Sequence, residues 1–151
     1  MNVNRPADGS LELRRVSIVD DDAAVREALE NLMRSAQIAV ETFASAEEFL
    51  SSARLADTEC LILDLYLPGL SGFELQEQLN AEHRDIPIIF ITAHADETAR
   101  ERALNSGAID MLGKPVRREA LFGAIRSAID SYALARTAAA GAPFLPLIQE
   151  S

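Results

Sequence analysis

The sequence predicts an α/β fold with a doubly wound, five-stranded parallel sheet. Five short apolar runs alternate with five segments whose apolar residues recur every three or four positions, which gives the order βαβαβαβαβα. The short runs are continuously apolar, as expected of strands that helices cover on both faces. With 151 residues, of which 48% are hydrophobic, the chain can bury a sizeable core within one domain.

The first two strand–helix pairs are predicted between residues 16 and 55. Residues 16–19 form an apolar run that stops at three aspartates, and residues 23–36 place their apolar side chains on one helix face. Asp22 is expected to cap this helix and to have no other role. Residues 38–43 predict the second strand. A serine followed three residues later by a glutamate is a capping box, which predicts a short helix over residues 45–55.

The third and fourth pairs follow the same pattern. Residues 60–64 are apolar up to a final aspartate, and a second capping box opens a helix over residues 71–79. Residues 86–91 are the strongest strand candidate in the sequence. The next helix is predicted over residues 96–105, because Gly107 lies just past its end, where a left-handed cap is common.

The last pair consists of a short strand over residues 109–112 and a helix whose one face is apolar over residues 121–132. We expect the folded domain to span residues 14–135, preceded by a loose polar arm over residues 1–13. Residues 136–151 are predicted to be a tail, since small residues and two prolines break the helical pattern. This tail is disordered, folds back on the domain or binds a partner through four large apolar residues, Phe144, Leu145, Leu147 and Ile148.

The charge balance argues against direct binding of nucleic acid. The chain has 14 basic and 24 acidic residues, and 14 − 24 gives a net charge of −10, which repels phosphate backbones and favours a cation or a basic partner. The single cysteine, Cys60, excludes an intrachain disulfide and is expected to be a small buried hydrophobe. The first residues lack the apolar region of a secretory signal, and no apolar run approaches the roughly 20 residues of a membrane span. We therefore expect a soluble, cytoplasmic protein that does not bind a membrane.

Charged or hydroxyl-bearing residues end four of the five predicted strands. The first strand ends in Asp20 and Asp21, the third in Asp64, the fourth in Thr92 and the fifth in Lys114. Ligands of open parallel sheets bind at the carboxyl ends of the strands, so these groups should meet at one edge. Crowded carboxylates favour a bound cation, and a hard ion whose shell is completed by water and phosphate oxygens describes Mg²⁺.

This combination of side chains suits phosphoryl transfer. Asp64 can act as the nucleophile, as aspartate does in enzymes that form an aspartyl phosphate. Mg²⁺ and the ammonium of Lys114 would spread the charge of the transferred group. The hydroxyl of Thr92 can donate a hydrogen bond to a phosphoryl oxygen.

Four short motifs in this order also carry a family resemblance. The chain resembles the receiver domain of bacterial two-component response regulators over about residues 14–135, through Val19-Asp20-Asp21, Leu63-Asp64-Leu65-Tyr66-Leu67-Pro68-Gly69, Ile91-Thr92-Ala93-His94-Ala95-Asp96 and Gly113-Lys114-Pro115. The resemblance implies a flavodoxin-like (βα)5 fold with strand order 2-1-3-4-5.

The resemblance also implies residue roles. Asp64 would be the phosphoacceptor and would take its phosphoryl group from a histidine kinase or a histidine phosphotransfer protein. Asp20, Asp21 and Asp64, with the backbone carbonyl of Tyr66, would bind Mg²⁺. The protein would not be an enzyme beyond the Mg²⁺-dependent phosphorylation and dephosphorylation of its own aspartate.

Further positions would surround the phosphoryl group. Thr92, Lys114 and the backbone of Ala93 would bind the phosphoryl group and take part in the switch. Pro115 would follow a cis peptide bond, which costs only about 0.5–1 kcal/mol before proline. Tyr66 and His94 would either influence how long the phosphoryl group survives or be surface residues that pack on each other.

The sequence departs from the family pattern at Met111, three residues before Lys114, where receivers usually carry an aromatic side chain that rotates inward. Methionine is flexible and cannot give a two-position aromatic switch. Phosphorylation is therefore expected to proceed while its coupling to the face of the fourth helix, fifth strand and fifth helix changes. Members of the family often form homodimers through that face, and Met111 makes this expectation less certain here.

We interpret the chain as a stand-alone receiver that alters its binding to a downstream protein on phosphorylation. One alternative is a receiver fragment of a transcription regulator, because the stretch from Ile91 to Asp96 is most similar to receivers attached to transcription activators. A second is a pseudo-receiver that never takes phosphate. A third is a small phosphatase, which usually needs an acid two residues after its nucleophile, where this chain has Tyr66.

Overall fold

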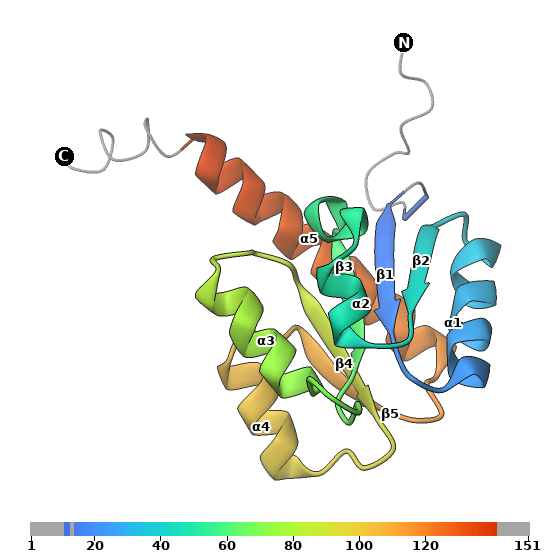
Figure 1. Ribbon diagram of the computed structural model, residues 1–151. Helices are drawn as coiled ribbons and strands as arrows, with labels where there is room; N and C mark the ends of the chain where they lie inside the picture. The colour runs from blue at the N-terminus through green and yellow to red at the C-terminus, as the bar shows by residue number, and fades with distance from the viewer. Residues whose placement is uncertain (1–10, 13, 142–151) are drawn as a thin grey trace.

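In the computed structural model, which describes residues 11, 12 and 14–141, strands and helices alternate along the chain (Figure 1). The elements are β1 (Arg15–Val19), α1 (Ala23–Ser35), β2 (Ala39–Phe43), α2 (Ala46–Leu50), η1 (Ala53–Asp57), β3 (Cys60–Asp64), α3 (Gly72–Ala81), β4 (Ile88–Thr92), α4 (Glu97–Asn105), β5 (Asp110–Gly113) and α5 (Arg118–Gly141). All four strand pairs are parallel, and the strand order is β2-β1-β3-β4-β5. The predicted α/β class and the flavodoxin-like order 2-1-3-4-5 are confirmed.

Helices cover both faces of the sheet and bury a separate core on each. Side chains of α1 and α5, among them Met33 and Ile125, pack with Ile62 of β3 on one face. Phe49 of α2 and the apolar residues of α3 and α4 pack with Leu63 on the other face. Neighbouring residues of β3 thus point into opposite cores, which explains why this strand is apolar throughout.

Two of the differences from the predicted elements have a clear local cause. The helix expected over residues 45–55 is α2 followed by the separate 3₁₀ helix η1, because Ser52 is extended and its hydroxyl caps the amide of Arg54. The fourth strand starts at Ile88 instead of residue 86. Pro87 precedes it and has no N–H for the sheet, while its carbonyl accepts from the amide of Leu61.

The ends of the domain also differ from the expected limits of 14 and 135. Helix α5 continues through good helix formers to Gly141, since the two prolines that suggested a tail lie beyond it. At the other end, Leu11 is 9% exposed and packs into the core beside α1 and α5. The rest of the predicted arm, residues 1–10 and 13, and the apolar tail residues after Gly141 lie outside the described residues.

Within the described residues, none of the helices combines the length and apolar character needed to cross a membrane. Cys60 is fully buried, as predicted, and burial raises the pKa of its thiol. An uncharged thiol inside an apolar core is inert, so Cys60 serves packing.

Candidate functional site

The register of the parallel strands brings the predicted site residues to one edge of the sheet. Asp64 pairs with Ile91 across β3 and β4, and Thr92 pairs with Gly113 across β4 and β5. The amide of Lys114, just after β5, donates to the carbonyl of Thr92 at 2.8 Å. Because the strands end at the same level, their last residues face a common space.

Three carboxylates occupy this edge. Oxygen atoms of Asp20, Asp21 and Asp64 all lie within 4.8 Å of one another. Asp20 is fully buried and Asp64 is 5% exposed, whereas Asp21 faces solvent. Such proximity of like charges in a buried setting favours either a proton or a cation between them.

The ammonium of Lys114 partly neutralises this cluster. Its Nζ lies 2.8 Å from Oδ2 of Asp20 and 3.4 Å from Oδ2 of Asp64. Partial burial acts to lower the pKa of Lys114, but the hydrogen bonds and charges of the two aspartates outweigh burial and raise the pKa. Lys114 therefore remains a fixed positive charge between two strand ends.

The negative charge of the Asp64 carboxylate is only partly neutralised by its neighbours. Burial and the nearby charge of Asp20 raise the pKa of Asp64, and the ammonium of Lys114 and an amide hydrogen bond oppose this rise only in part. That amide is the N–H of Tyr66, which donates to Oδ1 of Asp64 at 3.3 Å. The Asp64 carboxylate is thus held in place while part of its charge lacks a counterion.

The donor set fits a hard divalent cation. Oδ1 of Asp20 accepts from the amide of Asp22 at 2.9 Å, and the buried Oδ2 faces the Lys114 ammonium at 2.8 Å. Buried carboxylates are costly unless they are paired, and here the one ammonium of Lys114 serves the carboxylates of both Asp20 and Asp64. Asp20, Asp21 and Asp64 offer only oxygen ligands, as Mg²⁺ prefers, and could hold such an ion.

Thr92, Tyr66 and His94 lie at or just after the ends of β3 and β4, at the same edge of the sheet as Asp64. The Thr92 side chain is fully buried, and its hydroxyl accepts from the amide of His94 at 3.1 Å. Ala93 and His94 face solvent, and Tyr66 is 57% exposed. The rings of Tyr66 and His94 meet edge to face with centroids 6.5 Å apart, so the two predicted positions contact each other at the mouth of the site.

Met111 points into the core and is only 2% exposed. Its backbone is fastened to α4, because Arg100 donates to the Met111 carbonyl at 2.8 Å and pairs with the Asp110 carboxylate at 2.9 Å. The Lys114–Pro115 peptide bond is cis, in agreement with the expectation from the sequence. Arg100 was not anticipated, since nothing in its helical position marks it as a partner of β5.

Gly72 is a second residue that sequence analysis missed. A Cβ added there would lie 2.6 Å from the backbone oxygen of Asp64 and 2.9 Å from Cα of Leu65. The first turn of α3 can therefore pack against the end of β3 only without a side chain at this position. Glu47 was also missed: its carboxylate accepts from the amide of Leu70 at 2.9 Å and ties α2 to the loop after β3.

Comparison with known proteins gives a consistent result. The sequence model described as "Response regulator receiver domain" matches residues 16–126. The response regulator protein TodT of Pseudomonas putida is 46% identical over 114 residues, which are 76% of this chain and 50% of TodT. The chain thus spans about half the length of this curated relative.

Solved structures agree with the sequence comparison. The response regulator StyR superposes with a TM-score of 0.80 and 45% identity, over 92% of this chain and 70% of StyR. The receiver domain of Saccharomyces cerevisiae Ssk1, solved in complex with the histidine phosphotransfer protein Ypd1, superposes with a TM-score of 0.67 and 25% identity, over 74% and 85% of the two chains.

Proposed function

This chain belongs to the response regulator receiver domain family, whose members act in phosphorylation-dependent signalling and are not enzymes in the usual sense, and we propose that Asp64 is its phosphoacceptor. One observation carries the proposal. The carboxylates of Asp20 and Asp64, from different strands, converge on the ammonium of Lys114, with Asp21 close by.

Asp20, Asp21 and Asp64 would hold Mg²⁺ through their carboxylates, with the backbone carbonyl of Tyr66 as a further ligand. The bound ion would neutralise the crowded carboxylates and withdraw charge from the transferring phosphoryl oxygens. Support comes from the all-oxygen donor set and from the excess of carboxylates, since Lys114 is the single ammonium that pairs with Asp20 and Asp64 among the described residues.

The transfer itself is a substitution at phosphorus. A carboxylate oxygen of Asp64 attacks the phosphorus of a phosphohistidine, the P–N bond breaks and the imidazole leaves with the bonding electrons. Lys114 pairs with the incoming phosphoryl group, for which its place within 3.4 Å of Asp64 is suitable. The Thr92 hydroxyl and the Ala93 amide donate to phosphoryl oxygens, and the reorientation of Thr92 starts the switch.

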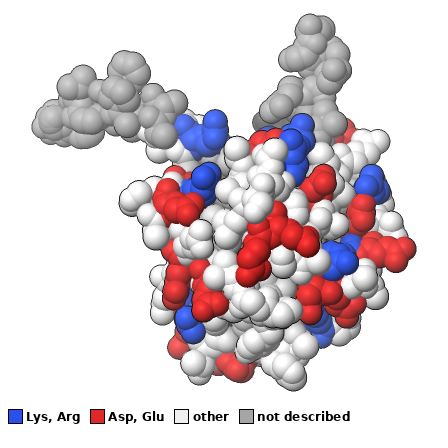
Figure 2. Space-filling model, viewed as in Figure 1, with Lys and Arg blue, Asp and Glu red and all other residues white. Residues whose placement is uncertain are grey.

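The proposed phosphoryl donor is a histidine kinase or a histidine phosphotransfer protein, and the proposed output is altered binding of a downstream protein. Acidic side chains spread over the face in Figure 2, which favours basic partners over nucleic acid. A homodimer through α4, β5 and α5 is a further expectation from the family resemblance.

Intact mass spectrometry after incubation with acetyl phosphate and Mg²⁺ tests the proposal. The chain should gain one phosphoryl group, and Asp64→Asn should abolish the gain. Asp22→Asn is the matched control, since asparagine also caps a helix, and it should leave the gain unchanged. Continuous release of phosphate without a labelled protein would indicate a phosphatase, and neither label nor turnover would indicate a pseudo-receiver.

A further inference from the structure

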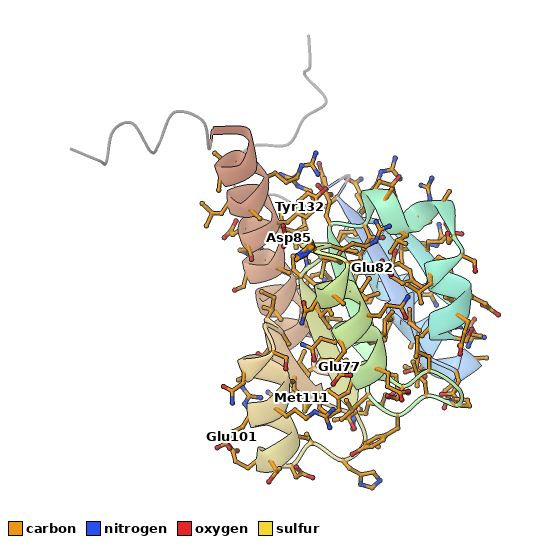
Figure 3. All side chains as sticks on the ribbon, turned by 60° about the vertical axis from the view of Figure 1, so that its left-hand side comes forward. Glu77, Glu82, Asp85, Glu101, Met111 and Tyr132 are labelled. Atoms are coloured by element: carbon orange, nitrogen blue, oxygen red, sulfur yellow. The ribbon has the colours of Figure 1, made fainter. Side chains whose placement is uncertain are left out.

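A surface groove lies at the opposite edge of the sheet from Asp64. It has a volume of about 710 Å³. Its walls are η1, the loop that follows α3 and the C-terminal half of α5. Figure 3 shows Tyr132 of α5 next to Asp85 of that loop, where α5 passes the end of α3. None of the proposed phosphoryl-binding residues lines it.

Apolar and charged residues share the lining of this groove. Leu55, Ala56, Ile86, Tyr132 and Ala135 supply apolar surface. A second hollow of about 250 Å³ adjoins it and shares residues 84–86 and Ala135, so the groove continues along α5. The apolar residues of such a groove can contact the large apolar side chains of a short segment, while the charged residues remain at the solvent.

The sequence supplies such a segment immediately after the helix that forms the wall. Ten residues follow Gly141, and four of them are Phe144, Leu145, Leu147 and Ile148. The helical rise from Ala135 to Gly141 is about 9 Å, and an extended chain covers about 10 Å between Gly141 and Phe144. A glycine at the helix end followed by Pro143 favours a change of chain direction.

We propose that residues 142–151 dock on the groove of their own chain, with Phe144 and Leu145 against Ile86 and Tyr132. The charge of the groove is compatible with this segment. Arg84 pairs with Glu82 at 3.0 Å, and the guanidinium of Arg136 donates to the Tyr132 hydroxyl at 3.2 Å. Arg84, Glu82 and Arg136 thus have partners within the domain, and the apolar lining residues are what the segment would cover. This docking is independent of the phosphoryl chemistry at Asp64.

Tryptophan fluorescence of the full chain tests the docking, because the natural sequence has no tryptophan. In Phe144→Trp, the indole is the only one in the protein. Since pockets bury 70–90% of a bound group, collisional quenching by acrylamide should be about threefold weaker than for a free indole derivative. The emission maximum should also lie at shorter wavelength than in water. Quenching equal to that of the free indole would overturn the proposal.

Replacing either of two alanines of α5 by glutamate locates the contact. In the Phe144→Trp background, Ala135→Glu places a charge in the groove and should restore full quenching. Ala133→Glu is the matched control, two residues away on an exposed part of α5, and should leave the protection unchanged. Protection that survives Ala135→Glu would mean that the segment lies elsewhere. Protection that rises with protein concentration would mean that a second copy supplies the segment, and either result contradicts the proposal.

Discussion

The ammonium of Lys114 lies 2.8 Å from Oδ2 of Asp20, closer than to the carboxylate of Asp64 at 3.4 Å. The lysine thus contacts the buried aspartate after β1 more closely than the residue proposed to receive the phosphoryl group. A cation bound to Oδ2 of Asp20 would compete for this contact and leave Lys114 available to Asp64. The predictions below start from this arrangement.

Mg²⁺ should stabilise the fold by relieving repulsion among the three carboxylates. At a concentration of 100 times the dissociation constant, binding adds about 2.7 kcal/mol to the free energy of unfolding. The melting temperature in Mg²⁺ should therefore exceed that in EDTA. Asp21→Asn should remove most of this rise, whereas Asp22→Asn should keep it. Equal melting temperatures in Mg²⁺ and EDTA would contradict the metal assignment.

The pH dependence of the free energy of unfolding should reveal the unfavourable burial of the Asp64 charge. Burial, followed by the charge of Asp20, raises the pKa of Asp64, so the folded state binds this proton more tightly than the unfolded chain does. The resulting stability is present below the ordinary pKa of aspartate and is lost as the pH rises through the raised pKa. In EDTA at pH 7, Asp64→Asn should thus increase the free energy of unfolding, by a gain on the order of 1 kcal/mol.

Denaturant titrations at two pH values check this effect. Near pH 3.5, about where an ordinary aspartate is half protonated, the difference between Asp64→Asn and the natural chain should shrink. Asp22→Asn, at an exposed carboxylate, provides the comparison. A loss of stability in Asp64→Asn at pH 7 would show that the pair with Lys114 outweighs burial.

Gly72 should not tolerate a side chain. The Cβ of Gly72→Ala would lie 2.6 Å from the Asp64 carbonyl oxygen, and both nearest atoms belong to backbone that cannot rotate away. Overpacking of this kind costs about 1–3 kcal/mol. Gly123→Ala is the matched control: nothing lies within 4 Å of its Cβ in α5, and the change should stabilise the helix by about 0.5–1 kcal/mol. Equal effects of the two changes in urea unfolding would refute the close approach.

Met111→Tyr should affect the switch more than the chemistry. Met111 is buried, so a larger ring would have to displace its neighbours, at about 1–3 kcal/mol, whereas Met111→Leu should cost below about 1.5 kcal/mol. The phosphorylation rate should change little, while the shifts that phosphorylation induces in the amide resonances of α4 should change strongly. A large loss of rate with unaltered resonances of α4 would reverse this ranking.

Local sequence patterns predicted the strands, the caps and the ends of strands that carry Asp20, Asp64, Thr92 and Lys114. They succeeded because the signals for burial on both faces and for helix capping depend on residues within or next to each element. The predicted length of helix α5 was too short, because the prolines after Gly141 were given more weight than the helix-forming residues before it.

The contacts that sequence could not reveal join distant segments. Gly72 is constrained by the Asp64 backbone across the turn from β3 to α3, and Arg100 reaches from α4 to the carbonyl of Met111. The groove is assembled from η1, the loop before β4 and α5, which are far apart in the chain. Such features depend on how elements pack, and no local pattern encodes them.

The strands have four or five residues, so the first and last residues of β3 are separated by about 13 Å. A phosphoryl donor approaching Asp64 therefore occupies one pole of the molecule, while the surface along Tyr132 belongs to the other pole. The phosphoryl donor and the docked residues 142–151 would therefore contact the domain at opposite ends of the sheet.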